Sequence, residues 1–373
     1  MEDFYEKCVT LMGQKLYESA YEFCRLGEEA TKDEALKSKF IFQKSLAAFA
    51  LGKIDEFATL CDTLMRQKVV DESIRNINRN NMWYAYQQLQ HLEIVDISKK
   101  ICLYDFASSN PSIIKYNDKL IINIMCHNFY VASPSNYWVK STKAAPTVEH
   151  PIVTRNFLFE ADLKLKNIKF WKELKPQIET NANATDLGFK DMRLFVKEAQ
   201  LCGIGTRYDT PNPNIQMSIV DIETEKSYWV NFCKDQVQKN WSPLKDRFVY
   251  CLNPYITLQI DEKGDPYNIK LMNTTTYVEA RGSSQYVPIQ GGYIGIIHDV
   301  IMKDERRVYM SRNVTLDEKM EIKRISKPYY LFHKKIEYIC GLERIGNKFY
   351  ISASIEDSEA FIVVVDADYF IKF

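Results

Sequence analysis

The stretch Arg281–Val300, RGSSQYVPIQGGYIGIIHDV, decides the fold that the sequence predicts. Its first five residues form a polar loop, and a short strand and turn follow, in which Gly291-Gly292 supply unrestricted φ angles. Tyr293 to Ile297 is apolar on both faces, so we expect a strand covered on both sides that ends at His298-Asp299. Ionisable groups at both ends of a buried strand suit a functional site. The alternative is a core strand that ends in a hydrogen-bonded histidine.

Short β-rich runs separated by Pro, Asn and Gly turns continue outward from this stretch, from about residue 96 to the C-terminus. Runs this short and regular are typical of a closed or layered β fold. About 270 residues follow the change in texture near Leu92–Ile101. Blades of roughly 50 residues would make five, so we expect residues 96–373 to be a five-bladed β-propeller. Leu163–Leu187 is expected to be a helical or looped insertion.

The N-terminal part has a helical pattern instead. Up to about residue 93 there is no proline, and apolar residues recur three and four apart. A weak repeat relates Tyr17–Cys24 to Ile54–Cys61, and the Leu51-Gly52 turn resembles the tetratricopeptide pattern. We expect residues 1–95 to form an α-helical, tetratricopeptide-like domain that binds a protein partner. A plain helical bundle is the alternative.

Composition narrows the classes of partner and compartment. The 49 basic residues balance the 49 acidic ones, which argues against duplex nucleic acid. Nine scattered cysteines without a CxxC pair, an acidic N-terminus and the lack of a long apolar run predict a cytoplasmic protein without a membrane span. Only five histidines occur, and none forms a zinc-spaced cluster, so we expect no metal and no other cofactor.

Polar clusters adjoin the predicted strands at intervals of about one blade. Such clusters converge on the axis if each belongs to the innermost strand of a blade. They include Asn110-Pro-Ser-Ile113, Thr154-Arg155-Asn156, Gly188–Arg193, Lys239-Asn240-Trp241, Arg281–Gln285, His298-Asp299 and Glu356–Ala360.

The order of these clusters resembles the five-bladed β-propeller enzymes that include the β-mannoside phosphorylases (glycoside hydrolase family 130) and related β-mannosyltransferases. Gly188-Phe-Lys-Asp191-Met-Arg193 is similar to the family motif Gly-x-Glu-Asp-Pro-Arg, whose Asp is the general acid. Asn110-Pro-Ser and Lys239-Asn240 are similar to segments of other blades, as is the block from Arg281 to His298. The sequence departs from the motif at Lys190 and Met192, and an Arg usual in blade one is replaced by Met125.

The resemblance implies an inverting glycosyltransferase that uses a phosphate-containing sugar donor, such as a nucleotide sugar, and a sugar or glycan acceptor. Asp191 would be the catalytic acid or base. The remaining expected substrate- or phosphate-binding residues are Arg193, Lys239, Asn240, Arg281, Gln285, His298, Arg155, Asn110 and Asp357. Trp241, Tyr286 and Tyr293 are expected either to pack on a sugar or to lie in the core. A phosphorylase or hydrolase of the same fold, and a non-catalytic carbohydrate-binding or scaffold protein, remain as alternatives.

Overall fold

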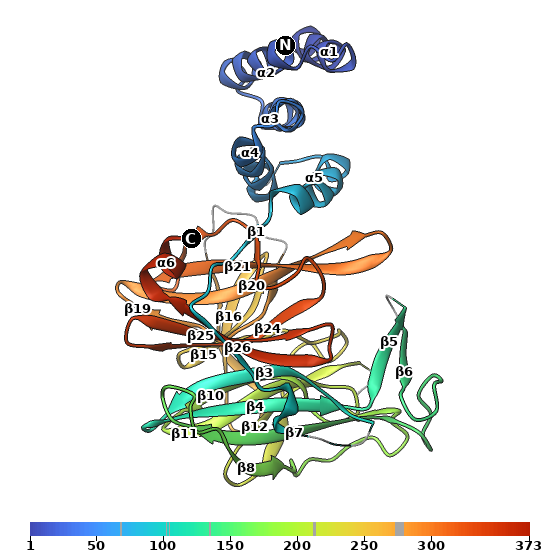
Figure 1. Cartoon of the computed structure of the whole chain (residues 1–373), viewed down its shortest axis with the longest axis vertical. Coiled ribbons are helices and arrows are strands. Elements are labelled where there is room, and N and C mark those ends of the chain that lie inside the picture. The colour runs from blue at the N-terminus through green and yellow to red at the C-terminus, as the bar shows by residue number, and fades with distance from the viewer. Residues whose placement is uncertain (68, 102, 104, 134–135, 212–213, 273–279) are drawn as a thin grey trace.

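The computed structural model describes residues 1–67, 69–101, 103, 105–133, 136–211, 214–272 and 280–373. It is mainly β, with helices at the N-terminus. Figure 1 shows these helices stacked above the sheets, with α1 and α2 farthest from them and α5 nearest. In the part of the chain that is described, no helix is both long and apolar enough to span a bilayer.

The N-terminal helices pack through their apolar faces. They are α1 (Glu2–Gly13), α2 (Tyr17–Ala30), α3 (Glu34–Ala50), α4 (Ile54–Arg66) and α5 (Glu72–Ala85). The Asp33 side chain caps α3 by accepting hydrogen bonds from two backbone N–H groups. The helices end at Ala85, and β1 (Gln87–Gln88) already pairs in parallel with β23 (Tyr329–Tyr330). The expectation of helix up to residue 93 is therefore wrong, because the chain joins a sheet before the apolar rhythm fades.

Five sheets of four or more strands lie in the described part of the chain. The first three follow one another in sequence. The first holds β3 (Ala107–Tyr116), β4 (Lys119–His127), β7 (Ile152–Ala161), β8 (Lys169–Leu174) and β9 (Asp186–Leu187). The second holds β10 (Lys190–Lys197), β11 (Gln200–Arg207), β12 (Gln216–Asp221) and β13 (Ser227–Trp229). The third holds β14 (Ser242–Leu244), β15 (Arg247–Leu252), β16 (Tyr255–Ile260) and β17 (Pro266–Leu271).

The last two sheets also take in strands from the N-terminal half. The fourth holds β18 (Arg281–Gly282), β19 (Val287–Ile289), β20 (Gly292–Lys303), β21 (Arg306–Asp317), β22 (Ile322–Ile325), β23 and β1. The fifth holds β24 (Glu337–Ile345), β25 (Lys348–Ile355), β26 (Glu359–Asp366) and β2 (Glu93–Asp96). Beside them lie the two-stranded sheet of β5 (Phe129–Ser133) and β6 (Asn136–Val139), the 3-10 helix η1 (Ser98–Lys100) and α6 (Ala367–Lys372).

Each sheet shares a buried apolar core with the next one. Leu158 and Leu194 join the first and second sheets, and Ile204 and Leu258 join the second and third. Further clusters join the third to the fourth and the fourth to the fifth. Ile362 of the fifth sheet packs in one cluster with the first sheet. The series of sheets therefore returns to its starting point.

The strand in Arg281–Val300 has the expected buried character, but not the expected end. Ile294, Ile296 and Ile297 are fully buried. The strand does not stop at His298, because β20 continues to Lys303 and pairs along its whole length with β21. Leu163–Leu187 is not the expected helical or looped insertion, because it contributes β8 and β9 to the first sheet.

Candidate functional site

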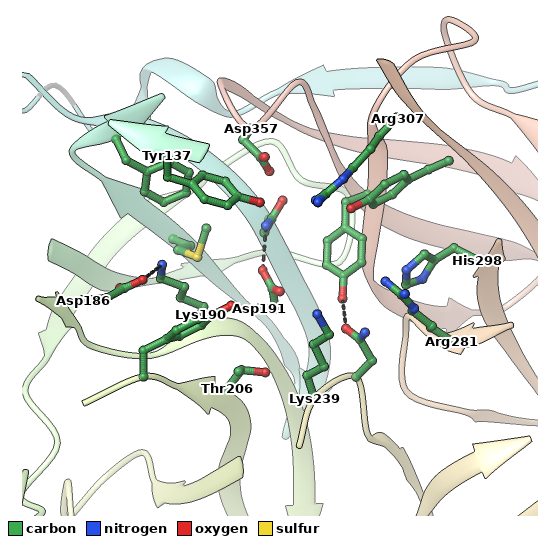
Figure 2. Close-up of a pocket in the computed structure, with 17 residues that line it drawn as sticks. Tyr137, Asp186, Lys190, Asp191, Thr206, Lys239, Arg281, His298, Arg307 and Asp357 are labelled. Atoms are coloured by element: carbon green, nitrogen blue, oxygen red, sulfur yellow. Dashed lines mark hydrogen bonds and ion pairs between the residues drawn. The ribbon is translucent and has the colours of Figure 1, made fainter. Parts of the chain in front are cut away.

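A pocket of about 150 Å³ lies where the five sheets meet. The lining side chains come from each of the five sheets or from loops next to their strands, and from the β5–β6 hairpin. They are Asn110, Met125, Phe129, Tyr137, Asp186, Lys190, Asp191, Thr206, Tyr208, Lys239, Asn240, Arg281, His298, Arg307, Tyr309, Tyr338 and Asp357. Figure 2 shows Asp191 near the centre with Asp357 above it, Lys239, Arg281 and Arg307 to one side, and Asp186 with Lys190 to the other.

Four of these residues have a left-handed backbone. The φ angles are 42° at Asn110, 53° at Asp191, 63° at Asn240 and 50° at Asp357. Asn and Asp are the non-glycine residues that adopt this conformation most readily. Backbone strain of this kind, at roughly 1–3 kcal/mol per residue, tends to gather at functional sites, where the surrounding structure holds it. At Asp357 the left-handed backbone belongs to the turn between β25 and β26, where it is usual, so the strain that points to function is at Asn110, Asp191 and Asn240.

Two carboxylates are linked through Asn110. The Asn110 side-chain amide donates to Oδ1 of Asp191 across 2.7 Å, and its carbonyl accepts a hydrogen bond from the Ser354 hydroxyl. Burial, together with the neighbouring Asp191, raises the pKa of Asp357 to about 6, although a hydrogen bond from Asn110 opposes the shift. Asp357 therefore retains its proton to a higher pH than an ordinary aspartate does.

The side of the pocket that lies across from Asp186 and Lys190 is cationic. Lys239, Arg281 and Arg307 all line it. Burial lowers the pKa of Lys239, and the neighbouring Arg281 lowers it further. Like charges held together in this way favour an anionic ligand, which would offset their repulsion.

Lys190 forms an ion pair with Asp186 and lies apart from these three cations. Its ammonium group lies 2.6 Å from a carboxylate oxygen of Asp186 and within 5 Å of the ring centroids of Phe129 and Tyr208. Burial raises the pKa of Asp186, whereas Lys190 acts in the other direction. The lysine that departs from the resembled motif thus neutralises an acidic group on the far side from the cationic wall.

His298 is in the pocket but does not add charge to it. It is 2% exposed, and its Nδ1 lies 2.8 Å from the Ser283 hydroxyl. Burial lowers the pKa of His298 to about 3, and Arg281, Arg193 and Lys239 act in the same direction. The imidazole is therefore neutral at physiological pH, and it offers the pocket a hydrogen-bonding group instead of a charge.

Arg193 lies beneath the pocket instead of lining it. Its guanidinium is fully buried and donates to the backbone carbonyls of Asp191, at 2.6 Å, and Ser283, at 2.8 Å. It also donates to the Tyr338 hydroxyl, which in turn donates to Asn240 at 3.1 Å. Arg193 therefore ties three elements of the pocket together and is not placed to touch a ligand.

Two further residues expected at the site are elsewhere. The Gln285 amide is buried and donates to the carbonyls of Ile113 and Leu342, so it clamps β3 to β24. Arg155 forms a bidentate pair with Glu173, both distances being 2.7 Å, on the first sheet. Neither is among the lining residues, because their side chains are used within the sheets.

The aromatic side chains were only partly anticipated. Trp241 and Tyr286 are buried in apolar cores, and Tyr293 packs on one of these cores, so none lines the pocket. The aromatic residues that do line it, beside Phe129, are Tyr137, Tyr208, Tyr309 and Tyr338.

Arg307 is the most important residue that sequence reasoning missed. One signal was available, since Arg307-Val-Tyr-Met310 alternates with period two, as a strand with one polar and one buried face does.

In the part of the chain that is described, no group of three or more His, Cys, Asp or Glu side chains is placed to hold a metal ion.

No protein-family model matches the sequence, and the search of curated proteins likewise gives no match. Among solved structures, the chain is similar to a β-1,2-mannobiose phosphorylase from Listeria innocua, with a TM-score of 0.51, 9% identity, and coverage of 75% of this chain and 99% of the other. It is also similar to a glycosyl hydrolase from Bacteroides ovatus, with a TM-score of 0.48, 12% identity, and coverage of 70% of this chain and 85% of the other. For a GDP-Man-dependent mannosyltransferase from Leishmania mexicana, the TM-score is 0.45 and the identity is 10%, with coverage of 78% of this chain and 93% of the other. At these identities the likeness concerns the fold.

Proposed function

We propose that the protein is a carbohydrate-active enzyme, an inverting glycosyltransferase that takes its sugar from a phosphate-containing donor such as a nucleotide sugar. The observation that carries this proposal is the division of one pocket into a carboxylate pair and a cationic wall. A sugar phosphate has the matching division, with a neutral ring at one end and an anionic group at the other. The shared fold with a β-1,2-mannobiose phosphorylase supports the choice of carbohydrate chemistry.

The reaction is a single displacement at the anomeric carbon. The acceptor hydroxyl oxygen attacks this carbon, and the bond to the donor phosphate oxygen breaks and leaves its electron pair on the phosphate. Asp191 takes the proton of the acceptor hydroxyl, and Asn110 orients its carboxylate. Lys239, Arg281 and Arg307 stabilise the charge that develops on the leaving phosphate. One displacement inverts the anomeric configuration.

A glycoside phosphorylase is the second candidate. The same cationic wall suits inorganic phosphate, which would attack the anomeric carbon of a disaccharide while Asp191 protonates the departing sugar. The two reactions use the same groups in opposite directions.

The architecture around the site extends this proposal. We take the five sheets as the blades of a closed five-bladed propeller, made of residues 96–373 together with β1 and β2, and preceded by a tetratricopeptide-like helical domain that ends at Ala85. Exposed apolar side chains on the helices, such as Val9, Leu16 and Leu26, support a protein partner there. Free cysteines in the described part of the chain support a reducing, cytoplasmic location.

The test is a turnover assay on the full chain with two substrate sets. GDP-mannose with mannose tests the transferase, read by release of GDP, and β-1,2-mannobiose with inorganic phosphate tests the phosphorylase, read by formation of mannose 1-phosphate. We expect turnover in the first set. Turnover in the second set alone would favour the phosphorylase. Binding of the sugars without turnover in either set would favour the non-catalytic alternative.

A further inference from the structure

The β20–β21 hairpin separates the pocket from the N-terminal helices. Side chains alternate across a strand, and the two faces of this hairpin are used differently. Arg307 and Tyr309 of β21 line the pocket. The intervening Val308, together with Met310 and Ile301, belongs to the same buried cluster as the helical residues. The hairpin therefore forms one wall of the pocket with one face and packs against the N-terminal helices with the other.

Two polar contacts fix the hairpin against the helices. The Tyr86 hydroxyl, just after α5, donates to the backbone carbonyl of Tyr309 across 2.9 Å. On α4, Asp62 pairs with Arg312 of β21 at 2.6 Å, and Arg312 pairs with Asp299 of β20 at 3.0 Å.

This ion-pair network is buried. The Arg312 and Asp299 side chains are 4% and 6% exposed, and Asp62 is 13% exposed. Asp299 directly follows His298, which lines the pocket. Breaking one partner of a buried pair is costly, because the other charge is left uncompensated. The contact between the helices and the hairpin is therefore a specific attachment next to pocket residues.

We infer that Asp62 and Tyr86 are positioning residues for the pocket, which act from the N-terminal helices through the β20–β21 hairpin to hold Arg307 and Tyr309 in its wall. The helices are then part of the binding machinery as well as a surface for partners. From the proposed function, this inference takes only the premise that the pocket binds a phosphate group.

The test measures binding of inorganic phosphate by calorimetry to the full chain and to Asp62→Asn and Tyr86→Phe. We expect affinity to fall roughly three- to tenfold in Tyr86→Phe, the range for loss of one hydrogen bond, and by at least as much in Asp62→Asn, which removes the charge that pairs with both Arg66 and Arg312. Tyr84→Phe is the matched control, because Tyr84 lies two residues before Tyr86, at the end of α5, and is 49% exposed. It should leave affinity unchanged, and Asp62→Glu should recover part of the loss.

A double-mutant cycle separates positioning from general loosening. In an Arg307→Gln background, Asp62→Asn and Tyr86→Phe should have a much smaller effect on affinity, because Arg307, the charged one of the two side chains that they position, is gone. Equal losses in both backgrounds would overturn the inference. Tyr86→Phe is the milder change and keeps the test valid if Asp62→Asn does not fold.

Amide hydrogen exchange provides a readout without ligand. Residues 300–309 should exchange faster in both variants than in the wild type, while β10 and β14 stay unchanged. If the wild type binds neither phosphate nor GDP-mannose, the proposed function fails and exchange alone decides the inference. Unchanged exchange in residues 300–309 would then overturn it.

Discussion

The Asn110 side-chain amide donates a hydrogen bond of 2.7 Å to Asp191, and both residues have a left-handed backbone. They lie 81 residues apart in the chain and on different sheets. Asn110 thus orients the carboxylate that we propose as the proton-transfer group, and both residues lie within strands, Asn110 in β3 and Asp191 in β10.

Asp191→Asn tests the proton-transfer role. An Asn side chain keeps the shape and still offers a carbonyl oxygen to Asn110, but it cannot accept the proton. We expect the turnover number to fall by ~10²–10⁴-fold, with donor affinity largely kept. The measurement is steady-state kinetics alongside calorimetric binding of GDP-mannose. Unchanged turnover would remove Asp191 from the mechanism.

Asp357 makes anion binding depend on pH. Its pKa of about 6 means that the carboxyl is neutral below this pH and repels anions above it. We expect affinity for sulfate, which does not titrate in this range, to fall as pH rises from 5 to 7. His298 is neutral throughout this range, because its pKa is about 3. Calorimetry at several pH values should show the fall in the wild type, and a flat profile in Asp357→Asn. A similar fall in both proteins would contradict the assignment.

The same group affects folding stability. The pKa of Asp357 is raised in the folded state, so the folded protein binds more protons than the unfolded chain between the ordinary value of 3.8 and about 6. Its contribution to the free energy of unfolding therefore falls as pH rises through this window. Chemical denaturation of the wild type and Asp357→Asn at pH 4 and pH 6.5 measures it. We expect the variant to gain stability relative to the wild type at the higher pH.

Gly188→Ala should disturb the turn that delivers Asp191. Gly188 has a φ of +96°, and an added Cβ would lie 2.1 Å from the Thr154 carbonyl oxygen. We expect a loss of roughly 2 kcal/mol or more in the free energy of unfolding. Gly346→Ala is the control, because its φ is +60° and nothing lies within 4 Å of its added Cβ. Equal losses in the two variants would show that the close approach to Thr154 is unimportant.

Arg193→Lys should destabilise the protein because one ammonium group cannot replace a fork that reaches Asp191, Ser283 and Tyr338 at once. We expect a loss of at least roughly 2 kcal/mol. Arg155→Lys should cost less than about 1 kcal/mol, because its pair with Glu173 is partly exposed. Thermal unfolding of both variants checks the contrast, and equal shifts would contradict the supporting role of Arg193.

Much of the fold was readable from local patterns. The helical rhythm predicted the N-terminal helices, and short β runs with turn residues predicted a chain that is mainly β. The end of β20 was not predictable, because the continuation from His298 to Lys303 depends on pairing with β21. The early start of β1 depends likewise on β23, more than 200 residues away.

The site was predictable where residue type and chain position agree. Asn110, Asp191, Lys239, Asn240, Arg281, His298 and Asp357 all line the pocket. Arg155 and Gln285 looked equivalent in sequence, but their hydrogen-bond partners use them inside the sheets. Arg307 was missed because its place in the wall depends on a hairpin that packs against the helices.

A crystal structure of the full chain soaked with GDP-mannose tests the proposed site directly. We expect the diphosphate to lie against Lys239, Arg281 and Arg307, with the sugar ring next to Asp191 and Asp357. A diphosphate bound elsewhere on the protein, or an empty pocket at a saturating concentration of GDP-mannose, would contradict it.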